Sequence, residues 1–255
     1  MSDTLLVLAA ALAAGFLDAG VGGGGMLLVP ALFAVYPGAP HALLMGTNKL
    51  ASSPGLGLAV WRYARGMRMP WRVALTTSAA YVCATVAGVT VSRMMPTAVF
   101  RLLVPVMLAA MLVYVLTRKD FGVTHAPRVD RGAAAALAIG GVLGFYEGFF
   151  GPGSGTLLIF AFVRVFGFDF MHAGAAAKVV NCAGCATAAI VFGVHGEIMW
   201  GLALGMASVY IAGAWVGAHV ALARGSRWLR MLFVVVASLL IARTGWDAVR
   251  NFQGA

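Results

Sequence analysis

Residues 46–50 read Gly-Thr-Asn-Lys-Leu and place a lysine inside an otherwise apolar run. A charge at the centre of a membrane helix costs roughly 3 kcal/mol even on lenient insertion scales, so Lys49 needs a partner and indicates a function. The same situation recurs in residues 175–181, Ala-Ala-Ala-Lys-Val-Val-Asn, and the two lysines are 178 − 49 = 129 residues apart. This spacing organises the rest of the chain.

Many other residues also recur 129 positions further along the chain. The correspondence runs without a gap from Gly15 to about Val106. It predicts that one unit was duplicated and fused. The matched pairs are Gly15 with Gly144, Phe16 with Phe145, Asp18 with Glu147, Gly22 with Gly151, Trp71 with Trp200, Tyr81 with Tyr210, Gly88 with Gly217, and Arg101 with Arg230.

The composition is that of a polytopic membrane protein. The chain has 255 residues, of which 62% are hydrophobic and only 10% charged, whereas a soluble domain carries about 25% charged residues. This excludes a soluble enzyme. The net charge of +10 comes from arginines in short connectors between apolar runs, where they determine topology, so we expect no nucleic-acid partner. The cysteines and histidines have no disulfide or metal-ligand spacing, and we expect neither a metal nor a cofactor.

The apolar runs predict an all-α integral membrane protein with about five membrane helices in each half. Each half begins with a broken-helix hairpin, because glycine costs about 1 kcal/mol relative to alanine in a helix. One break lies at residues 18–25, between runs 5–17 and 26–35, and the other at 151–155, between runs 133–149 and 156–166. Three transmembrane helices follow each hairpin: 41–63, 71–92 and 97–117, then 172–192, 200–222 and 228–249. The expected organisation is a first repeat at 1–117, a cytoplasmic linker at 118–131 and a second repeat at 132–255.

The arginines predict that the two repeats are inverted. The connector at 62–72 carries four arginines, whereas its counterpart at 193–199 carries no lysine or arginine. If the positive side is cytoplasmic, these equivalent connectors lie on opposite faces of the membrane. The linker at 118–131 then lies in the cytoplasm and both termini lie outside. We expect a multi-pass protein of the cell inner (plasma) membrane.

Inverted repeats with paired broken helices are typical of secondary transporters, with the site at mid-membrane. Helix starts carry unpaired N–H groups and partial positive charge, which favour an anion, and glycines let a ligand approach the backbone. We therefore predict alternating-access transport of a small anion. The candidate substrate-binding residues are Gly22, Gly23, Gly24, Gly25, Asn48, Lys49, Ser52, Gly151, Gly153, Ser154, Lys178 and Asn181.

Asp18 and Glu147 are candidates for proton coupling or for ion pairs. The purely structural alternative is that Asp18–Lys49 and Glu147–Lys178 pairs fasten each half. Since two acids and two lysines sum to zero, an entering anion makes the core negative unless something compensates. The natural remedy is a proton on one of the acids, although a sodium ion could serve instead. Gly88 and Gly217, by contrast, are expected to serve helix packing. Cys182 and Cys185 are spaced like a redox motif, but we interpret them as small packing residues.

The sequence resembles the TauE/SafE family of membrane permeases, also called the sulfite exporter family. The resemblance rests on GFLDAGVGGGGMLLVPALF (15–33), GTNKL (46–50), GFYEGFFGPGSG (144–155) and AKVVNCAGC (177–185). It implies an inverted-repeat transporter of small anions such as sulfite, thiosulfate, sulfonates or sulfoacetate. Carried over by position, it points to Gly22–Gly25, Asn48, Lys49, Gly151, Gly153, Lys178 and Asn181. The sequence departs from the family where Cys185 replaces a second asparagine, and where Ala51-Ser52-Ser53 replaces a frequent glutamine.

Three alternatives to an anion carrier stay open at this point. A cation or weak-base carrier would use Asp18 and Glu147 as ligands. A non-transporting membrane subunit would assist the assembly of another complex. A membrane-embedded enzyme would need a nucleophile with a base, or a clustered metal site, and the sequence shows neither. The expected partners are a small anionic substrate and the lipid bilayer, and a homo-oligomer is compatible with the sequence.

Overall fold

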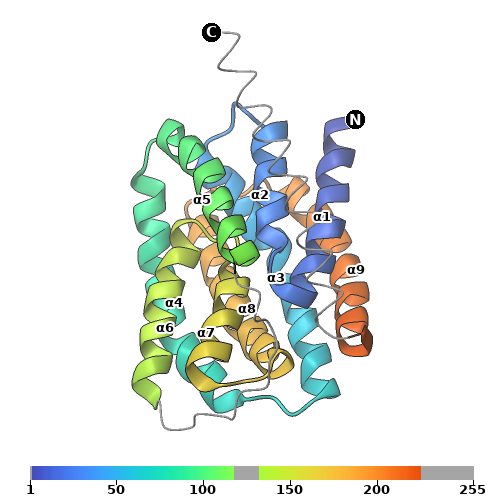
Figure 1. The fold of residues 1–255 in the computed structure, drawn as a ribbon. Coiled ribbons are helices and arrows are strands. Elements are labelled where there is room, and N and C mark those ends of the chain that lie inside the picture. Colours follow the sequence, from blue (N-terminus) through green and yellow to red (C-terminus); the bar gives the residue numbers. More distant parts are fainter. Residues whose placement is uncertain (1, 118–131, 225–255) are drawn as a thin grey trace.

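The structure is a computed structural model that describes residues 2–117 and 132–224. Those residues form helices joined by short connectors, and they contain no strand (Figure 1). The expected linker at 118–131 and the expected last span at 228–249 lie outside the described residues. The helices are α1 Ser2–Val21, α2 Gly24–Val35, α3 His41–Gly66, α4 Trp71–Met94, α5 Thr97–Thr117, α6 Ala133–Phe149, α7 Ser154–Phe166, α8 Phe170–Val194 and α9 Trp200–Arg224.

The predicted all-α membrane fold is confirmed for the described part of the chain. There, four helices are long and apolar enough to cross a membrane, namely α1, α4, α8 and α9. Helix α3 is equally long, with 26 residues, but Lys49 and its arginines lower its hydropathy. Large apolar side chains such as Leu102, Val142 and Ile190 lie exposed on the outside, while Lys49 and Glu147 are buried. This distribution suits a protein whose outer surface faces lipid.

Both hairpins are broken where glycines adopt positive φ. Helix α1 ends next to Gly22, with φ 80°, and the α6–α7 connection contains Gly151 and Gly153, with φ 86° and 84°. The first break is narrower than predicted, because Gly24 and Gly25 belong to the first turn of α2. A Cβ on Gly24 would lie 2.5 Å from the Tyr210 hydroxyl oxygen. Tight packing against α9 therefore outweighs the low helix propensity of glycine here.

Each broken helix packs against the other half of the chain. Helix α1 packs mainly on α9 and α6 mainly on α4, and the two pairs lie on opposite sides of the bundle (Figure 1). Gly88 and Gly217 permit these contacts, as predicted. A Cβ on Gly88 would lie 2.2 Å from the carbonyl oxygen of Phe145, and one on Gly217 would lie 2.2 Å from that of Phe16. These two contacts are again related by 129 residues.

Helices α3 and α8 pack against each other at the centre of the bundle in opposite directions. Gly46, near the start of α3, lies against the backbone of Glu197, just beyond the end of α8. Further along α3, the carbonyl oxygen of Ser53 lies 4.0 Å from Cys182 Sγ. The connectors that follow α3 and α8 therefore lie at opposite ends of the bundle, as an inverted repeat requires. At one end, Arg93 and Glu197 form an ion pair of 2.6 Å between the halves.

Candidate functional site

The two broken helices meet at their breaks. A Cβ on Gly22 would lie 2.6 Å from the carbonyl carbon of Gly155, and one on Gly25 would lie 3.4 Å from Cα of Pro152. Beside this contact is a small polar cavity. The cavity is lined by Asp18, Gly22, Gly25, Asn48, Lys49, Ser52, Glu147, Gly151, Gly153, Ser154, Asn181 and Cys185.

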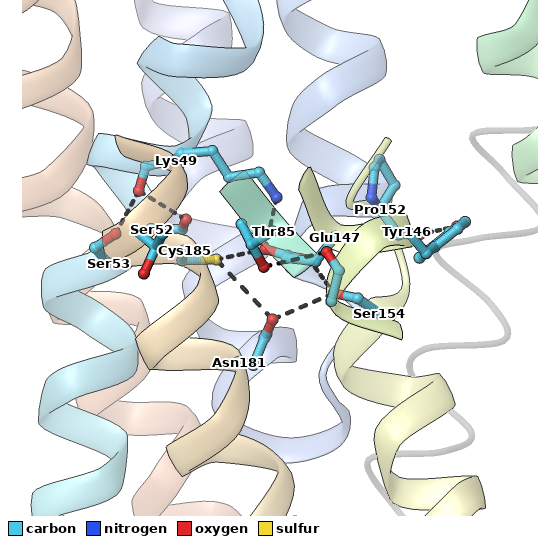
Figure 2. Close-up of polar contacts among 12 residues, drawn as sticks. Lys49, Ser52, Ser53, Thr85, Tyr146, Glu147, Pro152, Ser154, Asn181 and Cys185 are labelled. Carbon is cyan, nitrogen blue, oxygen red and sulfur yellow. Dashed lines mark hydrogen bonds and ion pairs between the residues drawn. The ribbon is translucent and has the colours of Figure 1, made fainter. Parts of the chain in front are cut away.

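An ion pair between the halves crosses this cavity. Lys49 Nζ donates to Glu147 Oε1 at 2.6 Å, and the two side chains are 3% and 1% exposed (Figure 2). The structural alternative of pairs within each half, Asp18 with Lys49 and Glu147 with Lys178, is wrong. The reason is that α6, which carries Glu147, packs into the first half against α4. Gly151 leaves room for the lysine, since a Cβ there would lie 2.2 Å from Lys49 Nζ.

Glu147 is held by two further donors. The hydroxyl of Ser154 forms a short hydrogen bond with Glu147 Oε2, and the thiol of Cys185 donates to Oε1 at 3.0 Å. Ser154 Oγ also lies 3.2 Å from Asn181 Oδ1, which links the start of α7 to α8 (Figure 2). The hydroxyl of Tyr146 donates to the carbonyl oxygen of Pro152 at 2.6 Å and fixes the connection between α6 and α7. The Glu147 carboxylate is therefore well satisfied in this conformation.

The equivalent acid and lysine, Asp18 and Lys178, are arranged differently. Asp18 Oδ2 accepts a hydrogen bond of 2.5 Å from the hydroxyl of Tyr210. Lys178 is 1% exposed, and its Nζ has no hydrogen-bond partner among the described residues. Asp18 lies near enough to act on it electrostatically. Of the two lysine–acid pairs between the halves, Lys49–Glu147 is thus closed and Lys178–Asp18 is open.

The helix starts add positive partial charge to the cavity. Helices α2 and α7 both begin after a glycine, Gly23 or Gly153, which has no side chain to accept from the first-turn N–H groups. Residues of both first turns, Gly25 and Ser154, line the cavity. Asn48 Oδ1 is buried without a hydrogen-bond partner among the described residues. The cavity therefore combines an ammonium, two helix starts and several hydrogen-bonding side chains, which suit a small oxyanion.

The cavity brings together most of the residues predicted from the sequence. Gly23, Gly24 and Lys178 do not line it, although Gly24 contacts Asp18 and Tyr210. Sequence reasoning missed the contact of Cys185 with Glu147 and that of Tyr210 with Asp18. The departure from the family at Cys185 was one available signal. The match between Tyr81 and Tyr210, 210 − 81 = 129 residues apart, was the other.

Comparison with known proteins decides the family. The family model described as "Sulfite exporter TauE/SafE" matches residues 7–244. The chain belongs to the TauE/SafE family. As a member of this family it is an integral membrane protein of a transporter class, which agrees with the resemblance drawn from the motifs. No solved structure matches the chain.

Curated relatives of this TauE/SafE protein carry transporter names. The chain is 32% identical over 235 residues to "Probable membrane transporter protein ORF9" of Sinorhizobium sp, which covers 92% of this chain and 89% of the relative. It is 29% identical over 238 residues to "Probable membrane transporter protein YfcA" of Escherichia coli (strain K12), covering 93% and 88%. A "Probable membrane transporter protein" of Haemophilus influenzae is also 29% identical over 238 residues, covering 92% and 91%. The function supported by these similarities is membrane transport.

Proposed function

We propose that this TauE/SafE protein is a secondary transporter of a small anion, with its binding site in the cavity between the two breaks. The observation that carries the proposal is that two broken helices from opposite halves meet beside buried Lys49. Their starts and the lysine favour negative charge, and Gly22 and Gly151 of the two breaks line the cavity. The family supports a sulfur-containing oxyanion or organosulfonate such as sulfite, thiosulfate or sulfoacetate.

The partners of the two acids favour an anion over a cation or weak base. A cation carrier would need free carboxylate oxygens that converge on one point. Glu147 instead accepts hydrogen bonds from Lys49, Ser154 and Cys185. Asp18 accepts a hydrogen bond from the hydroxyl of Tyr210. Binding a cation would require these donors to be displaced.

The packing supports alternating access by an inverted repeat in the inner membrane. Helices α3 and α8 are antiparallel, and each broken helix packs on the opposite half. We expect the two halves to offer equivalent routes to the central cavity from opposite ends. The duplicated charged centre argues against a non-transporting assembly subunit or an enzyme.

Proton coupling follows from the charges around the cavity. Its lining includes Lys49, Asp18 and Glu147, and Lys178 lies close enough to Asp18 to act on it electrostatically. With all four groups ionised their charges sum to zero, so a bound anion makes the region net negative unless a positive charge compensates it. We propose that Asp18 or Glu147 takes up a proton together with the anion, because neutralising one carboxylate restores the charge balance of the region. Anion and proton then move in the same direction.

Transport assays in liposomes test the substrate class. Purified protein should take up labelled sulfite, and unlabelled thiosulfate or sulfoacetate should compete, whereas labelled sodium, potassium or methylammonium should not accumulate. Uptake of a cation without any anion would overturn the proposal in favour of the cation carrier. If neither class is transported by protein that remains folded, the non-transporting subunit becomes the better account.

A further inference from the structure

We infer that the two lysine–acid pairs form alternately during the transport cycle, and that Tyr81 and Tyr210 each hold the acid whose lysine is withdrawn. In the conformation seen here, Lys49–Glu147 is closed and Lys178–Asp18 is open. In the opposite-facing conformation, Lys178–Asp18 is closed and Lys49–Glu147 is open. The inference rests on the proposed alternating access, and it assigns to two tyrosines a positioning role.

Four observations share one asymmetry. Lys49 is bonded to Glu147 at 2.6 Å, while the equivalent Lys178 has no hydrogen-bond partner among the described residues. Tyr210 is bonded to Asp18 at 2.5 Å. The hydroxyl of the equivalent Tyr81, close to Ser154, makes no hydrogen bond of ordinary geometry within the described part of the chain. If the two halves of the chain exchanged conformations, each of these four observations would apply to the equivalent residue, 129 positions away.

The two tyrosines have equivalent surroundings, so the two hydrogen-bond arrangements can be exchanged without a change of fold. A Cβ on Gly55 would lie 2.4 Å from the ring of Tyr210, and one on the equivalent Gly184 would lie 2.2 Å from the ring of Tyr81. That same Cβ on Gly184 would be 3.2 Å from Cγ of Glu147. Tyr81 therefore already lies beside Glu147, as Tyr210 lies beside Asp18.

The carbonyl groups next to the rings match as well. A Cβ on Gly15 would lie 2.2 Å from the carbonyl oxygen of Tyr210, and one on Gly144 would lie 2.4 Å from that of Tyr81. The broken helix that carries each acid thus packs directly against the backbone of the tyrosine. In the alternation inferred here, Glu147 moves from Lys49 to Tyr81 as α6 shifts against α4.

The open pair is costly on its own. A buried ammonium without a partner has lost its solvation, so Lys178 favours a conformation in which it reaches Asp18. The Tyr210 hydroxyl compensates Asp18, since a hydrogen bond to a carboxylate is stronger than one between neutral groups. Each acid therefore alternates between a bond to a lysine and a bond to a tyrosine, both from the other half.

Matched tyrosine variants test the inference in substrate-free protein in lipid nanodiscs. Tyr210→Phe removes a bond of the conformation seen here, and Tyr81→Phe removes a bond of its alternative. Hydrogen–deuterium exchange of the connectors 36–40 and 194–199 reports one end of the bundle, and that of 67–70 and 166–169 reports the other. The ratio of exchange rates at the two ends should change about tenfold, the factor expected for one lost hydrogen bond to a charged group, and in opposite directions for the two variants.

Lysine variants provide an independent pair. Lys49→Met weakens the conformation seen here and should shift the exchange ratio as Tyr210→Phe does, whereas Lys178→Met should shift it as Tyr81→Phe does. Shifts of the same sign in the two tyrosine variants, or in the two lysine variants, would overturn the inference. The absence of a shift in every variant that folds would also overturn it. Because no substrate is present, this result is separate from whether the protein carries sulfite.

Discussion

At the scale of single residues, Lys49 and Lys178 occupy equivalent positions but face different partners. Lys49 has a carboxylate at 2.6 Å, whereas Lys178 is buried beside an acid that is engaged by Tyr210. Both lysines add positive charge to the region where an anion would bind. Their replacement should therefore have the same effect on binding but different effects on stability.

We expect Lys49→Met and Lys178→Met each to abolish binding of labelled sulfite. Lys49→Met leaves Glu147 buried without its cation and should lower stability by about 3–5 kcal/mol. Lys178→Met removes an unpartnered charge and should leave the free energy of unfolding unchanged or raise it. Thermal unfolding in detergent and sulfite binding to purified protein measure the two effects. Wild-type binding by both variants would make the lysines structural only.

The residues that gather at the cavity could be predicted from the sequence, but their pairing could not. The repeat spacing and glycine clusters were sufficient to predict that Lys49, Asn48, Ser154 and Gly151 would share a site, because equivalent positions in an inverted repeat meet at its centre. They did not predict that Lys49 pairs with Glu147, 98 positions away. That choice depends on how α6 packs against the other half, which local sequence does not encode.

At the scale of helices, the spans predicted within the described residues agree with the structure to within a few residues. Apolar runs and proline–glycine connectors set these ends, and both are local properties of the chain. The first break was predicted too wide, because Gly24 and Gly25 are helical in α2. Glycines that permit close packing look the same in sequence as glycines that break a helix. Only the neighbour, here Tyr210, distinguishes them.

Close helix approach at Gly217 gives a prediction at this scale. Gly217→Ala places a methyl group 2.2 Å from the carbonyl oxygen of Phe16, which α1 can relieve only by moving away from α9. We expect a loss of about 1–3 kcal/mol, the usual range for overpacking. Gly201→Ala in the same helix is the matched control, since nothing lies within 4 Å of a Cβ there. Equal thermal stability of the two variants would contradict the packing described for α1 and α9.

At the scale of the whole molecule, the proposed transport cycle requires the two halves to be inserted into the membrane in opposite directions. The four arginines of 62–72 and their absence from 193–199 predict that these connectors face opposite sides of the membrane. Helices α3 and α8 lie antiparallel, as this orientation requires. The proposed alternation of the two ion pairs also needs this symmetry, because each pair must govern access from one side.

Site-directed labelling tests the orientation. Gly66→Cys and Val194→Cys place thiols at exposed positions at opposite ends of the bundle, and Val194 is 79% exposed. In a background without Cys83, Cys182 and Cys185, an impermeant maleimide on intact cells should label position 194 and spare position 66. Disrupted cells, in which both should react, are the control. Equal labelling of both positions on intact cells would refute the inverted repeat.

The central claim is that the cavity between the broken helices carries a small anion together with a proton. The most direct measurement is uptake of labelled sulfite into liposomes under an imposed pH gradient, with wild type beside Asp18→Asn and Glu147→Gln. We predict that wild-type flux follows the proton gradient, because an anion in the cavity requires a protonated acid. At least one neutral variant should still exchange sulfite while losing this dependence. Wild-type flux that is absent, or that is the same with and without the gradient, would contradict the account.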